Sequence, residues 1–344
     1  MKIPVNVIFS PAWWRRRYGI SFQEPFYLDV ETRIRNDVLM RRGLFETFGI
    51  GEPDPRPRPV IGSRHIAGGF VMAALFDVPV RFSDDQAAWA LPRNLDRASI
   101  LALRAPEIET AWPMNVLIGQ MDALEARFGY VTGDLDIAGI LNTAQEIRGN
   151  GLFMDLLEDE ELTEHLFSIV AETQVRVARC LRRRTGTTSI SVNRSILDVD
   201  PRIHLASNCS VSMISPELYG RRILRHEMYA ARELAPYGIH HCGNNLQKYA
   251  RQYGSMDLRF LDVGAGSDVA ACGRLYPNAF LNLRLSPVHL LQNSENDVYT
   301  ETLELLRACG RRENVGVCCI NMDAATPDAN VKAMFAAARD YSGN

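Results

Sequence analysis

From about residue 130 to its end, the chain alternates short apolar runs with longer amphipathic segments. The apolar runs predict strands, which we expect to begin near Tyr130, Ser189, His204, Gly238, Arg259, Ala279 and Val315. The amphipathic segments predict helices over residues 142–157, 161–184, 216–235, 268–275, 296–311 and 327–341. Such alternation is typical of parallel strands joined by helical crossovers. The 344 residues suffice for one barrel with an added segment, so we predict an α/β fold, a (β/α)8 TIM barrel with an N-terminal extension.

The first sixty residues have a different pattern. An aromatic and arginine-rich opening over residues 13–18 precedes a helix predicted over Val30–Phe48, with Asp29 as its N-cap. Prolines then occupy every second position from Pro53 to Pro59, which excludes a helix or a central strand there. We therefore predict an N-terminal extension over residues 1–60 and a barrel catalytic domain over residues 61–344.

Composition narrows the class of protein. The 38 basic and 41 acidic residues give a net charge of −3, without the basic field that nucleic-acid binding needs. The longest apolar runs, such as residues 70–76, are far shorter than the roughly 20 residues that span a bilayer, and no secretory signal pattern is visible. Seven cysteines, an odd number, favour free thiols in a reducing compartment. We expect a cytoplasmic protein without nucleic-acid or membrane partners.

A candidate metal-binding pair stands where a strand should end, in the segment Gly238 to Asn245. Successive side chains of a strand point to opposite faces, so His240 and Cys242 share one face while His241 points to the other. Their nitrogen and sulfur atoms are ligands that zinc accepts. A lone histidine or cysteine is usually structural, so the pair needs a further ligand to indicate a metal site.

Further ligands are available at the ends of other predicted strands. The last strand carries Cys318 and Cys319, and alternation means that only one of them faces the barrel interior. Asp262 ends the strand that begins near Arg259. It is a candidate fourth ligand or a hydrogen-bond partner of His240, and a plain helix cap or barrel-mouth hydrogen bond is an equal alternative.

Candidate substrate contacts are less specific. Trp14 and Tyr18 either form an aromatic lid over the site or pack the extension onto the barrel. Asn208 and Cys209 follow the strand at His204 and fall on the catalytic face of a barrel. Arg284 is suited to hold a substrate carboxylate in a bidentate pair.

From about residue 133 to its C-terminus, the chain resembles the uroporphyrinogen decarboxylase superfamily. The resemblance is to its zinc-dependent, corrinoid-linked methyltransferase branch, which contains O-demethylases and coenzyme M methyltransferases. The segments that carry the resemblance follow the family's order and are AQEIRG at 144–149, ISPELY at 214–219, HHCGN at 240–244, residues 262–268, LSP at 285–287 and TPDANV at 326–331.

The resemblance implies a ligand set. Members of this branch bind zinc through a His-x-Cys pair and a distant cysteine near the last strand. In this chain these correspond to His240, Cys242 and one of the two adjacent cysteines, and the same residues would be catalytic. We favour Cys319, which lies nearer the TPDANV segment, and Cys318 is the alternative.

The resemblance also implies an activity. It predicts a corrinoid-dependent methyltransferase that moves a methyl group from a methyl ether substrate to the corrinoid (cobalamin) of a partner protein. The cofactors would be zinc and the partner's corrinoid, and the partners a corrinoid protein and a small methylated substrate. Transfer from a methyl-corrinoid to a thiol is one alternative. A metal-free decarboxylase is another, but residues 283–287 read Leu-Arg-Leu-Ser-Pro where the decarboxylase pattern has Gly-Asn-Leu-Asp-Pro.

Overall fold

The computed structural model describes residues 2–188 and 194–343, and the strand predicted at Ser189 lies outside these residues. The strands are β1 (Val5–Phe9), β2 (Val60–Gly62), β3 (Val80–Arg81), β4 (Trp89–Ala90), β5 (Thr132–Asp134), β6 (His204–Ser207), β7 (Tyr237–His241), β8 (Leu258–Val263), β9 (Phe280–Arg284) and β10 (Val315–Met322).

The helices of the N-terminal half are α1 (Pro11–Tyr18), α2 (Glu24–Leu28), α3 (Val30–Phe48), α4 (Val71–Ala74), α5 (Arg97–Ala102), α6 (Met114–Phe128), α7 (Ile140–Arg148), η1 (Gly149–Gly151), α8 (Leu152–Glu158) and α9 (Glu160–Thr185). Those of the C-terminal half are α10 (Ser195–Val199), η2 (Ser210–Met213), α11 (Pro216–Arg222), α12 (Leu224–Glu233), η3 (Leu246–Tyr249), α13 (Ala250–Tyr253), α14 (Val269–Leu275), α15 (Pro287–Gln292), α16 (Glu295–Cys309) and α17 (Asp328–Gly343). Among the described residues, no helix has the length and apolar character needed to cross a membrane.

Most elements predicted from the sequence are confirmed. Strands β5 to β10 begin within two residues of the predicted positions, and α3 has the predicted bounds. The side chain of Asp29 accepts a hydrogen bond from the backbone N–H of Thr32 at 2.8 Å, as expected of an N-cap. The helix predicted over residues 142–157 is interrupted at Gly149, whose φ of 72° lies in the left-handed region that favours glycine.

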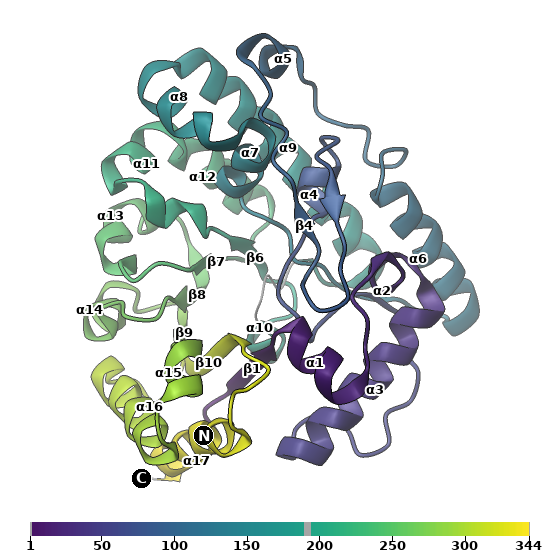
Figure 1. Ribbon diagram of the computed structural model, residues 1–344. Helices are drawn as coiled ribbons and strands as arrows, with labels where there is room; N and C mark the ends of the chain where they lie inside the picture. The colour runs from purple at the N-terminus through teal and green to yellow at the C-terminus, as the bar shows by residue number, and fades with distance from the viewer. Residues whose placement is uncertain (1, 189–193, 344) are drawn as a thin grey trace.

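The central layer is a six-stranded parallel sheet with the order β1-β10-β9-β8-β7-β6. Figure 1 shows this sheet curling into a half-barrel, with α11, α13, α14, α16 and α17 on its outer side. Strands β2 and β5 form a separate parallel pair, and one bridge between Ala138 and Ser207 joins the segment after β5 to β6. Because all strands of the half-barrel run in one direction, their carboxyl ends lie at one edge of the sheet.

The described residues show part of the predicted (β/α)8 barrel, and strand pairing among them does not show a closed one. Among the described residues, the six-stranded sheet and the β2–β5 pair remain separate sheets, and no strand pairing closes β1 onto β2. The alternation of apolar runs and helices identifies the parallel α/β architecture, but it does not contain the pairing register that decides closure. The observed architecture is therefore α/β with a curled parallel half-barrel.

The N-terminal segment is more closely integrated with the barrel than the predicted extension implies. Strand β1 pairs in parallel with β10 and is an edge strand of the half-barrel. Its apolar residue Phe9 stacks on Trp13 with ring centroids 4.0 Å apart and on Phe48 at 5.3 Å. Residues 1–60 thus supply both a strand of the sheet and part of its aromatic packing, while the domain boundary at residue 60 stays a prediction.

A buried charge network connects this N-terminal segment to the rest of the chain. The carboxylate of Asp37 on α3 accepts a hydrogen bond from Arg41 at 2.9 Å and two from Arg58 at 2.9 and 2.7 Å. The Nε2 atom of His65 lies 3.7 Å from Asp37. The backbone carbonyl of His65 in turn accepts a hydrogen bond from the indole of Trp14 at 3.2 Å. The network therefore holds His65 in place. The chain continues from His65 to residues 67–69, which line the cavity described below.

Candidate metal centre

Two cysteines and a histidine meet at the carboxyl ends of β6 and β7. His240 lies on β7, Cys242 follows β7 by one residue, and Cys209 is the residue that precedes the 3-10 helix η2. One ligand atom from each of the three lies within 4.8 Å of the others, and no other such group of three is present in the described part of the chain. The donor atoms are two sulfurs and one imidazole nitrogen, a set that zinc accepts.

The orientation of His240 is set by the neighbouring strand. Its Nδ1 atom lies 2.6 Å from Asp262 Oδ2, and Asp262 Oδ1 accepts a hydrogen bond from the amide of Asn282 at 2.8 Å. An imidazole that donates Nδ1–H to a carboxylate directs the lone pair of its other nitrogen outward. Burial lowers the pKa of His240, but the hydrogen bonds to Asp262 and Cys242 outweigh it and raise the pKa to about 9. Of the alternatives for Asp262, the hydrogen-bond partner is the one observed.

The Cys242 thiol lies in a polar environment. A hydrogen bond from Cys209 lowers the pKa of Cys242, and the hydrogen bond and charge of His240 and the charge of Arg284 lower it further against burial. Arg284 Nη1 donates directly to Cys242 Sγ at 3.2 Å. The same interaction with Cys242, together with burial, raises the pKa of Cys209. Of the two sulfurs, Cys242 is therefore the one on which negative charge is favoured.

The prediction from strand alternation is confirmed for the two adjacent histidines. His241 points away from the cluster, and its ring nitrogens lie 3.0 Å from the hydroxyl of Tyr253 and 2.9 Å from the amide oxygen of Asn245. Burial lowers its pKa to about 4. The neutral side chain of His241 therefore faces the helical layer outside β7, and His240 is the one that faces the cluster.

The cluster opens into a cavity of about 550 Å³ at the carboxyl ends of the strands. Its wall includes residues 67–69 and 85–90, together with Asp136, Glu146 and Arg284. Two glycines in this wall are required by the backbone. A Cβ at Gly69 would overlap the carbonyl oxygen of Asp136, and Gly68 has a φ of 120°, which favours glycine. The volume falls within the range of small-molecule sites.

Besides the exposed Asp85, two carboxyl groups line this cavity. Asp136 accepts hydrogen bonds from Ser207 Oγ at 2.9 Å and from the backbone N–H of Gly68 at 3.1 Å. Glu146 lies on α7, and burial, followed by the charge of Asp136, raises its pKa to about 7. The cavity thus contains an acid that can exchange a proton near neutral pH.

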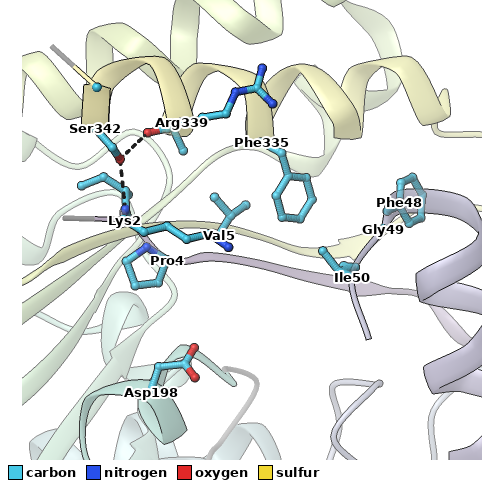
Figure 2. A pocket seen from close by; sticks show the side chains of 13 residues that line it. Lys2, Pro4, Val5, Phe48, Gly49, Ile50, Asp198, Phe335, Arg339 and Ser342 are labelled. Atoms are coloured by element: carbon cyan, nitrogen blue, oxygen red, sulfur yellow. Dashed lines mark hydrogen bonds between the residues drawn. The ribbon is translucent and has the colours of Figure 1, made fainter. Parts of the chain in front are cut away.

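A larger cavity of about 920 Å³ lies at the opposite end of β1. Figure 2 shows it between Val5, Ile50 and Phe335, with Ser342 on its rim. Its lining contains neither histidine nor cysteine. Ligands of parallel α/β folds bind at the carboxyl ends of the strands, which favours the cavity beside Cys242 as the functional site.

The structure does not bring the two adjacent cysteines of β10 into the cluster. The register pairs Cys318 with Arg284, so Cys318 faces the barrel interior, with its Sγ 3.9 Å from Asp262 Oδ1. Cys319 faces the opposite way, into the main apolar core, and burial raises its pKa to about 12. The favoured third ligand, Cys319, therefore lies on the wrong face of its strand, and Cys209 takes its place in the observed grouping.

Three of the candidate substrate contacts lie outside the cavity. Trp14 is buried against Trp13 and Tyr18, and the Tyr18 hydroxyl donates to the backbone carbonyl of Gly43 at 3.2 Å. Of the two alternatives for this pair, packing of the N-terminal segment is the one observed. The amide of Asn208 is buried and donates to a Glu227 carboxylate oxygen at 2.9 Å. Arg284, by contrast, lines the cavity.

Sequence reasoning missed three residues of the site. It placed Cys209 on the catalytic face without recognising it as a member of the cluster, and it did not single out Asp136 or Glu146. The only signal for Glu146 was its position in the AQEIRG segment that carries the family resemblance. Asp136 follows β5 by two residues, which is the position where polar residues of a catalytic face are expected.

No protein-family model and no curated protein matches the sequence. Among solved structures, the fold is similar to that of a methyltransferase from Methanosarcina mazei, with a TM-score of 0.69 and 14% identity over 99% of this chain and 94% of the other. It is also similar to a B12-independent methionine synthase from Shewanella sp. W3-18-1, with a TM-score of 0.50 and 9% identity over 99% of this chain and 98% of the other. At such low identities these similarities show a shared fold, and a catalytic role must be argued from the site itself.

Proposed function

We propose that this protein is a zinc-dependent methyltransferase that moves a methyl group from a small methyl ether to the corrinoid of a partner protein. The observation that carries the proposal is the meeting of Cys209, His240 and Cys242 at the catalytic edge of a fold shared with a methyltransferase. The cavity beside them has the volume of a small-molecule site.

The residues present fit a zinc ion. Neighbouring groups lower the pKa of Cys242, and Asp262 accepts from His240 Nδ1, so the other ring nitrogen would bind the ion after it loses its proton. Three protein ligands leave one position for a substrate, which is the arrangement of catalytic rather than structural zinc sites. The ligand set proposed here is Cys209, His240 and Cys242. The set with Cys319 or Cys318 that the family resemblance implies is the alternative.

The residues around the cluster have separate roles in this proposal. Asp262 keeps the His240 ring in one orientation, and Asn282 keeps Asp262 in place. The guanidinium of Arg284 stabilises negative charge on Cys242. When bound, zinc supplies Lewis acidity toward an ether oxygen, which is a poor leaving group on its own.

The carboxyl groups of the cavity are relevant to the direction of methyl transfer. Methyl transfer from a corrinoid to a thiol requires the acceptor to lose a proton, whereas cleavage of an ether requires the departing oxygen to gain one. Glu146, with a pKa raised to about 7 and a position on the cavity wall, suits the second requirement. A carboxyl group with this pKa can also accept a proton, so the thiol acceptor stays the alternative, and the corrinoid assay below decides between them.

Two measurements test the proposal in sequence. Elemental analysis of protein purified without chelators is expected to give about one zinc per chain, and less than about 0.2 would contradict the metal site. The zinc-loaded protein is then mixed with a cobalt(I) corrinoid protein and a panel of methoxylated compounds. We expect the absorption band of the methylated corrinoid with at least one ether, and its absence with every ether would contradict the proposed donor class.

A further inference from the structure

Glu146 is an unusual residue of the cavity wall because one of its oxygens lacks a partner. The Oε2 atom is enclosed, and within the described residues it has no hydrogen-bond partner. Buried polar atoms are nearly always hydrogen-bonded, so an exception in a ligand cavity calls for an explanation. A hydrogen bond between this carboxyl group and an atom of a bound substrate would explain it.

The neighbouring acid has a different environment. Both carboxylate oxygens of Asp136 are engaged, one by Ser207 Oγ and the other by the backbone N–H of Gly68. Hydrogen bonds donated to a carboxylate favour its ionised form, and two nearby acids rarely ionise together. Burial raises the pKa of both acids, but hydrogen bonds from Ser207 and Gly68 counteract it only at Asp136. Because Glu146 Oε2 has no such donor among the described residues, we assign the proton to Glu146.

We propose that Glu146 is a catalytic acid that protonates the leaving atom of the methyl donor as the methyl group departs. This inference rests on the proposed function and adds to it the residue that supplies the proton. The geometry behind it is the position of Glu146 on the wall of the cavity that also contains His240 and Cys242.

The step balances in atoms and electrons. The bond between the methyl carbon and the ether oxygen breaks, and its electron pair remains on the oxygen. The methyl carbon forms a new bond with the electron pair of the cobalt(I) corrinoid supplied by the partner protein. The carboxyl proton of Glu146 moves to the oxygen, an alcohol or phenol leaves, and the Glu146 carboxylate regains a proton from water.

The kinetic test compares donors whose leaving groups differ in acidity. Glu146→Gln keeps the size of the side chain but removes the proton, and it is expected to slow methyl transfer from an alkyl ether by about 100-fold. Transfer from an ether of an acidic phenol should slow by less than about threefold, because such a leaving group needs no proton. Glu146→Asp retains an acid and should recover part of the rate with the alkyl ether. Glu158→Gln, on the exposed surface of α8, is the matched control and should behave like the wild type.

A second readout does not depend on turnover. The infrared band of a protonated carboxyl group should be present in the zinc-loaded wild type at about pH 6 and disappear on titration through about pH 8. The component of this band that titrates between about pH 6 and about pH 8 should be missing from Glu146→Gln, while zinc content and thermal unfolding stay unchanged.

The outcomes separate this inference from the proposed function. A wild type that methylates corrinoid from ethers, with Glu146→Gln equally slow or equally fast on all donors, would overturn the role of Glu146 alone. A wild type that uses no ether at all would overturn the proposed function and this inference together.

Discussion

Removal of Asp37 should reveal how strongly the buried charge network stabilises the N-terminal segment. The Asp37 and Arg41 side chains are each 6% exposed, whereas Arg58 is 21% exposed. Asp37→Ala removes the three hydrogen bonds that these arginines donate to the carboxylate. Each hydrogen bond to a charged group contributes about 1.5–3 kcal/mol, so the gross loss is large.

Two features reduce the net loss of stability that Asp37→Ala causes. Arg41 keeps an ion pair with Glu52 at 2.6 Å and a hydrogen bond to the carbonyl of Arg56. Arg58 is partly exposed, so it can turn toward water when its partner is removed. We therefore expect a loss of about 3 kcal/mol in the free energy of unfolding, at the lower end of the range for breaking a buried ion pair.

The assay is urea unfolding followed by circular dichroism, with Asp54→Ala as the matched control. Asp54 also pairs with an arginine, Arg42, but at 3.9 Å and with 94% of its side chain exposed. Its removal should cost less than about 0.5 kcal/mol. If Asp37→Ala lowers the free energy of unfolding no more than Asp54→Ala does, the buried network does not stabilise the N-terminal segment.

Two further predictions concern the metal centre and the response to acid. Asp262→Ala removes the acceptor of His240 Nδ1–H and should weaken zinc affinity by about 10–100-fold in competition with a chelating dye; an unchanged affinity would contradict the orienting role of Asp262. Burial, with a smaller contribution from the charge of Arg182, lowers the pKa of His204 from 6.5 to about 3, so only the unfolded chain binds this proton at mildly acidic pH. From about pH 6.5 down to about pH 5, the free energy of unfolding should therefore fall by about 2 kcal/mol from this group, and urea titrations of His204→Gln should show a shallower fall than those of the wild type.

The parts of the fold that follow from local periodicity could be predicted from the sequence. The strands after residue 130 and the orientation of His240 against His241 depend only on alternation within one segment. The role of β1 as an edge strand could not be predicted in this way, because its pairing with β10 joins opposite ends of the chain. The same reason explains why closure of the barrel was not decided by the pattern.

The third member of the Cys209–His240–Cys242 cluster shows a different limit of prediction from the sequence. Strand alternation applies to Cys318 and Cys319, but which of them faces inward depends on a register that only the folded sheet defines. Cys209 lies after β6 in a helical backbone conformation, with φ −64° and ψ −45°, so the rule for strands no longer gives its direction. Its proximity to Cys242 is a consequence of parallel strands ending at one edge.

The most direct test of the account is the zinc content of four proteins: the wild type and the Cys209→Ala, Cys318→Ala and Cys319→Ala variants. We predict about one zinc per chain in the wild type and in both β10 variants, and less than about 0.2 in Cys209→Ala, with thermal unfolding to confirm that each variant is folded. X-ray absorption of the wild type should show two sulfur ligands and at least one nitrogen. A Cys209→Ala protein that retains its zinc, beside a Cys318→Ala or Cys319→Ala protein that loses it, would contradict the ligand set proposed here.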